Sequence, residues 1–392
     1  MSKLRETAAL FLGAIPVFLG YETWKGDEKF YSNILMPAIH NCFSPETAHN
    51  LAIKLLSLGL VPKGKNEQYD KLSCKVFGQT FSNPLGIAAG FDKHAEAIDG
   101  LNKLGFGFVE VGSITPLPQE GNAKPRVFRL PEDKVVINRY GFNSCGHDAA
   151  AARLDKLTKE CNINRCKTLF NTVSGIGTIV LGVNLGKNKE STDFTKDYTD
   201  GVTKLGKYAD YIVINVSSPN TPGLRSLQGR QNLQDLCTNV VTVKEGLPNK
   251  PSILVKIAPD LTEDDKQDIA YALLQSKVDG LIVSNTTVAR PSTLVNSHKS
   301  ERGGLSGKPL CEIIINSLSF LFPGKLPIIG VGGIWNGKDA YDKIKAGASL
   351  IQIYTSLIYE GPPLVGKIKR ELNQLLEKDG FTNVAEAVGA DH

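Results

Sequence analysis

Eight short apolar runs recur along the chain, and each run ends in a polar or glycine-rich tip. The runs occupy residues 86–90, 108–113, 180–184, 211–215, 253–256, 281–285, 328–333 and 350–355. Continuous Val, Ile and Leu segments of this length are typical of strands buried on both faces, as in a parallel sheet covered by helices. Their alternation with helical stretches predicts an α/β fold, a (β/α)8 TIM barrel preceded by an N-terminal helical segment.

Polar and glycine residues lie at the predicted strand ends or directly after them. In a (β/α)8 barrel the carboxyl ends of the strands and the loops that follow them form the active site. The residues at these ends are Lys93, Ser113, Asn184, Asn215, Lys256, Asn285, Gly333 and Thr355. We therefore expect the chemistry to converge on one face of the barrel.

The N-terminus carries a further apolar run at residues 8–20, followed by Tyr21 and Trp24. As a helix this run would be about 20 Å long, which is shorter than the roughly 30 Å hydrocarbon core of a bilayer. A cleaved signal peptide, a buried helix and a membrane anchor are the three alternatives. No small-residue cleavage site follows the run, and the aromatic pair is typical of a membrane interface, so we favour the anchor.

The chain of 392 residues is longer than a minimal barrel of about 250 residues, which leaves room for other segments. We expect a targeting or membrane-anchor segment at 1–26, a helical segment at 27–62 and the barrel at 70–392. Ser44 as N-cap and Pro45 at the first helical position predict the start of an amphipathic helix. The helices of 27–62 could pack on the barrel or lie on a bilayer.

Composition excludes several classes of function. The chain is 41% hydrophobic and 22% charged, as in an ordinary globular protein. Its net charge of +5 is mild and no basic run is interleaved with aromatics, so we expect no nucleic-acid partner. The seven cysteines form no CxxC pair, and the six histidines form no HExxH motif. We therefore expect free thiols and no metal site.

Glycine-rich segments follow the last three predicted strands. They are residues 303–307, 330–333 and the turn at Tyr354 and Thr355. TIM barrels often bind phosphate in the loops after strands seven and eight, where bare glycine amides approach the anion closely. The position of these segments after the last three predicted strands therefore predicts a phosphate-bearing ligand. The absence of a GxxxxGK[ST] motif disfavours nucleotide hydrolysis.

Two lysines end predicted barrel strands or follow them directly, namely Lys93 and Lys256. An unpaired buried ammonium is very costly, so each needs a partner. A structural ion pair, for instance with Asp92 or Glu110, is one interpretation of Lys256. Ligand binding is another, and the residue type alone also allows a Schiff-base lysine as in aldolases.

Asparagines cluster at the strand ends and in the loops beyond them: Asn138, Asn143, Asn184, Asn215, Asn220 and Asn285. An amide offers both an acceptor and two donors, so several of them would recognise a planar ligand such as a pyrimidine ring.

Ser218 lies in a proline-rich loop without a neighbouring His or a GxSxG motif, which disfavours a hydrolase triad. If Ser218 accepts a proton, it must do so in a dry pocket.

Several motifs together resemble one enzyme family. They are residues 86–93, 138–143, 182–189, the Ser218 loop, 303–309 and 330–333. On these motifs the chain closely resembles the class 2, membrane-associated dihydroorotate dehydrogenases. The resemblance implies an enzyme of the inner mitochondrial membrane that oxidises (S)-dihydroorotate to orotate through FMN, reduces ubiquinone and serves de novo pyrimidine synthesis. It also implies contact between the N-terminus and membrane lipid.

The resemblance assigns roles to individual residues. The residues implied to hold FMN are Ala89, Gly90, Lys93, Ser113, Asn184, Asn215, Lys256, Ser284, Gly307, Gly333, Tyr354 and Thr355. The residues implied to bind dihydroorotate are Lys93, Asn138, Arg139, Tyr140, Gly141, Phe142, Asn215, Asn220, Asn285 and Thr286. Ser218 would remove the C5 proton while the C6 hydride passes to the flavin. Lys256 would place a positive charge at the flavin pyrimidine edge.

A quinone tunnel between the two N-terminal helices is also implied, with His49, Arg129 and Tyr354 at the matching positions. His40 lies where relatives can carry glutamine, which leaves quinone contacts there open. Taken without the resemblance, His49 is more simply an ordinary half-buried histidine. The alternatives to the whole assignment are a soluble flavin barrel that reduces fumarate or NAD, a Schiff-base aldolase and a non-catalytic, membrane-tethered barrel.

Overall fold

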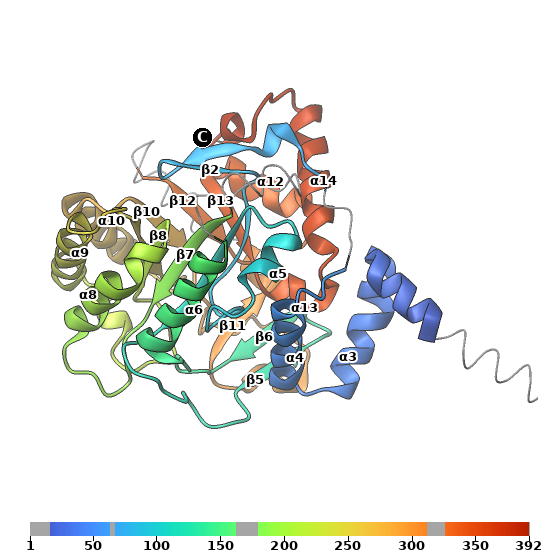
Figure 1. Ribbon diagram of the computed structural model, residues 1–392, viewed down its shortest axis with the longest axis horizontal. Coiled ribbons are helices and arrows are strands. Elements are labelled where there is room, and N and C mark those ends of the chain that lie inside the picture. The colour runs from blue at the N-terminus through green and yellow to red at the C-terminus, as the bar shows by residue number, and fades with distance from the viewer. Residues whose placement is uncertain (1–15, 63–66, 162–178, 312–325, 392) are drawn as a thin grey trace, which may run out of the picture.

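The computed structural model describes residues 16–62, 67–161, 179–311 and 326–391 (Figure 1). Eight parallel strands close into one barrel in the order β10-β12-β13-β3-β4-β7-β8-β9. Their bounds are β3 (Leu85–Ile87), β4 (Phe108–Ile114), β7 (Val180–Leu185), β8 (Tyr211–Asn215), β9 (Ser252–Ile257), β10 (Gly280–Val283), β12 (Ile328–Val331) and β13 (Ala348–Ile353). All eight predicted strands are present, and the predicted TIM-barrel fold is confirmed.

Helices cover the outer face of the barrel (Figure 1). They are α5 (Ile98–Lys103), α6 (Gly146–Cys161), α8 (Phe194–Leu205), α9 (Arg230–Glu245), α10 (Glu263–Ser276), α12 (Gly337–Lys345), α13 (Thr355–Glu360) and α14 (Leu364–Lys378). Short 3₁₀ turns lie at Asp70–Leu72, Gly206–Tyr208, Arg225–Gln228, Ser297–Ser300, Lys308–Cys311 and Val384–Ala387. The helices explain why the strands are apolar on both faces, since one face meets the barrel interior and the other meets this helical layer.

Two small antiparallel sheets lie outside the barrel. The first is a hairpin around Gly78, formed by β1 (Cys74–Val76) and β2 (Gln79–Phe81). The second joins β5 (Val127–Leu130) and β6 (Val135–Asn138) to β11 (Gly304–Gly307). This second sheet ties the long insertion after β4 to the loop after β10. Residues 162–178, which follow α6, lie outside the described residues.

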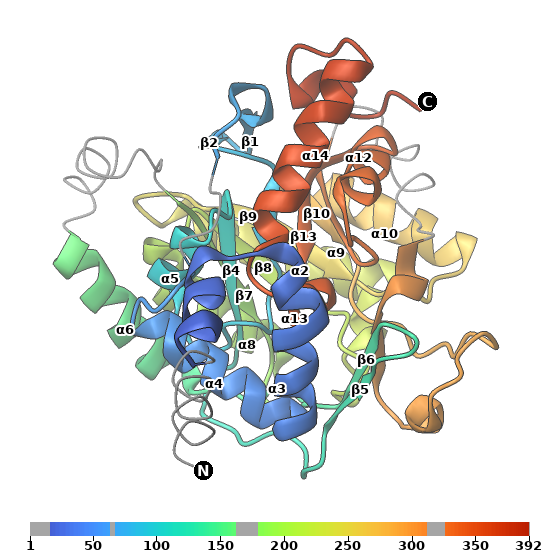
Figure 2. The ribbon, with the colours of Figure 1, turned by 90° about the vertical axis from the view of Figure 1, so that its right-hand side faces the viewer.

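The N-terminal helices pack on one side of the barrel (Figure 2). Residues 16–25 are helical. They are followed by α2 (Glu28–Phe30), a π-helical turn at Tyr31–Leu35, α3 (Met36–Cys42) and α4 (Pro45–Ser57). As predicted, Ser44 caps α4, and its side chain accepts a hydrogen bond from the Thr47 backbone N–H at 3.3 Å.

Only part of the predicted anchor run falls within the described residues, because residues 8–15 lie outside them. Over the part of the chain that the structure describes, no helix has both the length and the apolar character needed to cross a bilayer.

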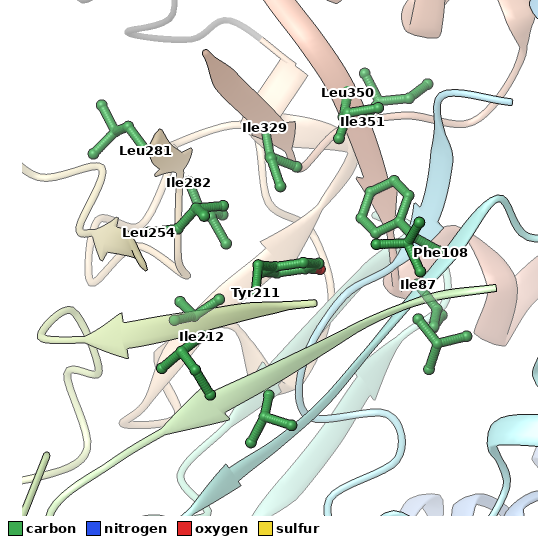
Figure 3. Packing of buried hydrophobic residues seen from close by; sticks show 14 of the residues in the cluster. Ile87, Phe108, Tyr211, Ile212, Leu254, Leu281, Ile282, Ile329, Leu350 and Ile351 are labelled. Atoms are coloured by element: carbon green, nitrogen blue, oxygen red, sulfur yellow. The ribbon is translucent and has the colours of Figure 1, made fainter. Parts of the chain in front are cut away.

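Large apolar side chains from the barrel strands pack together in the core (Figure 3). The rings of Phe108 and Tyr211 are completely or almost completely buried and lie next to each other, with centroids 6.4 Å apart. Each ring lies directly over a glycine on a neighbouring strand. A Cβ at Gly86 would be 2.4 Å from the Phe108 ring, and one at Gly182 would be 2.1 Å from the Tyr211 ring.

We predict that Gly86→Ala lowers the free energy of unfolding by about 1–3 kcal/mol, because the added methyl overpacks the Phe108 ring. Urea unfolding of the purified protein measures this loss. Adding Phe108→Leu should recover part of it by removing the ring. Gly229→Ala is the control, since a Cβ there meets nothing closer than 3.6 Å at a negative φ of −63°. Equal losses at Gly86 and Gly229 would contradict the packing argument.

Candidate active site

A cavity of about 760 Å³ lies at the carboxyl ends of the barrel strands and extends between the N-terminal helices. Most residues that the sequence predicts to be functional line it. The lining residues from the predicted cofactor set are Ala89, Gly90, Lys93, Ser113, Asn215, Lys256, Ser284, Gly307, Gly333, Tyr354 and Thr355. Those from the predicted substrate set are Lys93, Asn138, Tyr140, Gly141, Phe142, Asn215, Asn220, Asn285 and Thr286. Ser218, His49 and Arg129 line the same cavity.

Two predicted site residues are placed differently. Asn184 is completely buried below the cavity floor and contacts the lining residues from beneath. The Arg139 guanidinium donates to Glu301 Oε2 at 2.6 Å and to the Pro125 carbonyl at 3.0 Å, and it does not line the cavity. A substrate contact through the Arg139 side chain therefore has no support in this geometry.

The three asparagines predicted at matching strand ends do converge. Asn215 Nδ2 donates to Asn184 Oδ1 at 3.1 Å and to Ser113 Oγ at 3.0 Å. Asn285 Nδ2 lies 3.5 Å from Asn215 Oδ1 and donates to Ser217 Oγ at 2.9 Å. The strands that carry these asparagines meet because the barrel is closed. The three amide side chains therefore form a continuous layer across its mouth. Such a layer suits a planar ligand that carries alternating donors and acceptors.

Both predicted lysines lie in the cavity wall. Burial lowers the pKa of Lys256, and the negative charge of Glu110 opposes this effect. Among the described residues no carboxylate oxygen comes within 4.0 Å of the Lys256 ammonium, so the ion pair that we considered is not a direct contact. Burial also lowers the pKa of Lys93 to about 7, although the charge of Glu46 raises it. Lys93 Nζ donates to the Gly90 carbonyl at 2.6 Å and lies 4.1 Å from the Tyr140 ring centroid.

Ser218 is buried, with 7% of its surface exposed, in the loop after β8. Its hydroxyl oxygen accepts a hydrogen bond from the Asn220 backbone N–H at 3.3 Å. Asn220 in turn donates through Nδ2 to the Asn138 carbonyl at 3.1 Å, which ties the loop to the insertion. The buried Thr221 hydroxyl has no hydrogen-bond partner among the described residues. Sequence reasoning did not single out Thr221, and its position three residues after Ser218 was the available signal.

The glycine-rich turns predicted to bind phosphate adopt backbone conformations that require glycine. Gly307, Gly332 and Gly333 have φ values of 123°, 105° and 71°. A Cβ at Gly307 would also lie 2.3 Å from the Lys134 carbonyl oxygen. The Thr355 hydroxyl beside them donates to Ser306 Oγ at 2.8 Å. Bare amides and hydroxyls at the ends of β12 and β13 are a donor set that fits a phosphate-bearing cofactor.

The part of the cavity between the N-terminal helices is apolar. The His49 ring packs edge-on against Phe91 at 5.3 Å, and Phe91 contacts Tyr354 at 5.8 Å. Arg129 Nη2 donates to the His40 carbonyl at 3.0 Å and also to the Phe43 carbonyl. Burial lowers the pKa of His49 and brings that of His40 to about 4, so both imidazoles are neutral at neutral pH. His49 is therefore half-buried, as the simpler interpretation expects, and it also lines the cavity.

Many exposed apolar side chains lie in the N-terminal segment that forms this apolar part. They are Val17, Phe18, Leu19, Tyr21, Trp24, Ile34, Phe43, Leu51, Leu55, Leu58 and Leu60. Phe43 lies between α3 and α4, and the others belong to the N-terminal helices or follow α4. Trp24, Leu51, Leu55 and Leu60 also line the cavity. A set of this size is larger than the isolated apolar residues found on ordinary protein surfaces.

A buried ion pair fixes α4 to the barrel insertion. Arg126 Nη2 donates to Glu46 Oε1 at 2.7 Å, and Arg126 Nη1 donates to the carbonyls of Glu120 and Asn122 at 2.6 and 3.0 Å. Partial burial alone would raise the pKa of Glu46, but the hydrogen bonds and charge of Arg126 outweigh it and lower that pKa. The pair therefore holds the wall of the apolar cavity in place.

One family of known proteins matches most of the chain. The family model described as "Dihydroorotate dehydrogenase" matches residues 71–376. A mouse protein named "Dihydroorotate dehydrogenase (quinone), mitochondrial" is 52% identical and covers 99% of this chain and 97% of its own. A Rhodospirillum rubrum protein named "Dihydroorotate dehydrogenase (quinone)" is 52% identical over 89% of this chain and 91% of its own. The crystal structure of ligand-free DHODH from Eimeria tenella is 44% identical, with a TM-score of 0.84 over 89% of this chain and 99% of that one.

We predict that the stability contributed by the Glu46–Arg126 pair is lost in acid. The folded-state pKa of Glu46 is below its ordinary value of 4.5, so the contribution is complete above that value and disappears as pH falls through the folded-state pKa. At neutral pH Glu46→Gln should cost about 1–3 kcal/mol, because it leaves a buried guanidinium poorly paired. The difference in Tm between wild type and variant should shrink as the pH falls.

The control is Lys124→Gln, whose exposed ammonium lies 3.7 Å from the same carboxylate. An exposed pair of this kind contributes little, so Tm should barely change. A Glu46→Gln deficit that stays constant as the pH falls would contradict the assignment.

Proposed function

The chain belongs to the dihydroorotate dehydrogenase family, and from that premise we propose that it oxidises (S)-dihydroorotate to orotate with FMN as cofactor and ubiquinone as electron acceptor. The step belongs to de novo pyrimidine synthesis. The observation that carries this function is a single cavity with an amide-lined polar end at the barrel mouth and an apolar end between the N-terminal helices. A quinone acceptor rather than fumarate or NAD is also in the names of the relatives.

The polar end of the cavity has the groups that dihydroorotate needs. Ring amides and carbonyls would pair with the side chains of Asn138, Asn215, Asn220 and Asn285, which lie on different elements around the mouth. Lys93 would oppose the substrate carboxylate. A bound anion beside Lys93 favours its protonated form, so the substrate itself would raise the lowered pKa of this lysine.

The family is flavin-dependent, and FMN fits the donor set on the other side of the mouth. When bound, FMN would accept the hydride from the substrate and release the electrons to the quinone. The backbone amides of Gly307, Gly333 and Thr355 would hold the phosphate. Lys256 would face the pyrimidine edge of the ring, where its positive charge favours the electron-rich state.

Ser218 would act as the base that accepts the C5 proton at its Oγ atom. A serine hydroxyl is a weak base in water, so this role requires the dry surroundings that burial of the loop provides. The proton must then move on from Ser218. The buried Thr221 hydroxyl, which has no hydrogen-bond partner among the described residues, lies three positions further along the loop and could receive it.

The apolar end of the cavity would admit ubiquinone. His49, Arg129 and Tyr354 would lie along its path, and the exposed apolar residues around the opening would face membrane lipid. In this proposal residues 1–26 form the targeting and anchor segment, 27–62 form the quinone tunnel, and 70–392 form the FMN barrel. The mouse relative is named mitochondrial, and a lipid-soluble acceptor favours the inner mitochondrial membrane.

We predict that the purified protein is yellow and that dihydroorotate bleaches its flavin absorbance without oxygen. Ser218→Ala should keep the colour but slow the bleaching by about 10²–10⁴-fold, because general base catalysis contributes a factor of this size. Stopped-flow absorbance measures both rates. Ser226→Ala serves as the control, since this exposed serine lies in the same region outside the cavity. A colourless protein would refute the proposed function, whereas unchanged bleaching in Ser218→Ala would remove only the serine from it.

We predict that Leu55→Glu raises the KM for a short-chain ubiquinone about tenfold, because it places a carboxylate at the apolar opening. Flavin reduction by dihydroorotate should be unchanged. Leu58→Glu is the matched control on the same helical segment, since Leu58 is exposed but does not line the apolar cavity. Equal effects at Leu55 and Leu58 would contradict a quinone path past Leu55.

A further inference from the structure

Glu110 is a charged residue inside an otherwise apolar barrel strand, and its side chain is completely buried. It accepts hydrogen bonds from three other strands of the barrel. Asn184 Nδ2 donates at 2.8 Å, the Tyr211 hydroxyl at 3.3 Å and Gln352 Nε2 at 2.7 Å. A buried carboxylate is costly unless it is fully hydrogen-bonded and its charge is opposed. The proposed function assigns no role to Glu110, although this cluster lies directly below the asparagine layer.

The carboxylate determines which way the Asn184 amide faces. An ionised carboxylate only accepts hydrogen bonds, so Asn184 must present its NH₂ group to Glu110. Its carbonyl oxygen then faces the opposite way, where it accepts from Asn215 Nδ2 at 3.1 Å and from the Ser113 hydroxyl. Reversing the Asn184 amide would place its NH₂ group against the NH₂ group of Asn215.

The same constraint passes from Asn215 to Asn285. Because Asn215 donates toward Asn184, its carbonyl oxygen is free to accept from the Ser217 hydroxyl at 2.8 Å and faces Asn285 Nδ2 at 3.5 Å. Asn285 therefore keeps its own carbonyl oxygen toward the Thr286 backbone N–H at 2.7 Å. The Glu110 carboxylate at the barrel centre therefore fixes the orientation of the Asn184 amide. Asn184 in turn orients Asn215, and Asn215 orients Asn285 at the cavity wall.

Glu110 is also connected to the position of Lys256. Lys256 is paired in register with Asn215 across β8 and β9, and Asn215 donates to Asn184, which donates to Glu110. No carboxylate in the described residues lies within 4.0 Å of that ammonium, and Glu110 is the acidic group whose field acts on it. The other polar side chains around Glu110, namely Asn184, Tyr211 and Gln352, are uncharged. Burial disfavours the ammonium form, so the negative charge of Glu110 is what favours it.

We propose that Glu110 is a positioning residue for flavin reduction, which orients the asparagine layer and is the buried counter-charge of Lys256. This inference rests on the proposed function, because it concerns the residues that would hold FMN and dihydroorotate. Glu110 acts through Asn184, Asn215 and Lys256 and does not line the cavity itself.

The test is Glu110→Gln, which keeps the size of the side chain and removes its charge. Flavin reduction by saturating dihydroorotate is followed in single turnovers from mildly acidic to mildly alkaline pH, and each rate is divided by the wild-type rate. Without the counter-charge the pKa of Lys256 falls further, so the ammonium loses its proton as the pH rises. The ratio should then fall by about tenfold per pH unit above that pKa. A ratio that does not depend on pH overturns the proposal.

The KM for dihydroorotate separates the orienting role from the charge. At the acidic end, where Lys256 stays protonated, Glu110→Gln should still raise KM by about 2- to 10-fold, since Asn184 is free to turn. An unchanged KM there would contradict the orienting role.

Two variants exclude a merely structural explanation. Tyr211→Phe removes one hydrogen bond to the same carboxylate but leaves its charge, so its rate ratio should not depend on pH. Glu110→Asp also keeps the charge and should give a flat ratio, but its shorter side chain withdraws the acceptor from Asn184, so its KM should rise as in Glu110→Gln. If Glu110→Gln does not fold, an unchanged KM in Glu110→Asp contradicts the orienting role. A falling ratio in either variant overturns the proposal. Failure of dihydroorotate to bleach the wild type would instead refute the proposed function.

Discussion

The site depends on the closure of eight parallel strands into one ring. In a parallel ladder the register decides which inward-facing side chains lie at the same height, and here it pairs Asn215 with Lys256 across β8 and β9. β10 pairs with β9 on one side and β12 on the other, so the ring has no free edge. The polar residues at the strand ends meet because of backbone hydrogen bonds far from the cavity. An open sheet with the same sequence would spread them along one edge.

Polarity changes along the cavity, and under the proposed function this change would separate the two substrates. At the barrel mouth amides and lysines replace the water that surrounds an anionic heterocycle. Between α3 and α4 the lining is aliphatic and aromatic, and the histidines there are neutral at neutral pH. An anion that entered the apolar end would lose its hydration without compensation, whereas a quinone loses little. Under the proposed function, the geometry would therefore select each substrate by the free energy of desolvation.

Several charges are buried in this fold, and each is satisfied differently. Asp92 accepts backbone N–H bonds from Glu96 at 2.9 Å and Ala97 at 2.8 Å, which fixes the loop after β3. Arg126 is paired with Glu46 and holds α4. Glu110 is surrounded by neutral donors and faces the charge of Lys256 only at longer range. Buried ionic groups are weak contributors to stability, so their common property is that they position elements around the cavity.

Features that depend on residues close together in the chain could be predicted from the sequence. The eight strands and the cap at Ser44 were predictable, because burial patterns and capping act over a few residues. The motif residues were predictable as a set, and most of them line one cavity. Glu110 and Gln352 left a signal too, as single polar residues inside apolar runs, but that signal did not say what they contact.

Only the tertiary structure decided the rest. The sheet that joins β11 to β6, the turn of Arg139 away from the cavity and the pairing of Glu46 with Arg126 depend on residues far apart in the chain. The Gln352–Glu110 hydrogen bond spans 242 positions. Local patterns record which face of an element is buried, and they carry no information on which distant residue it meets. That pairing is settled when the ring closes, because closure sets the distances between strands.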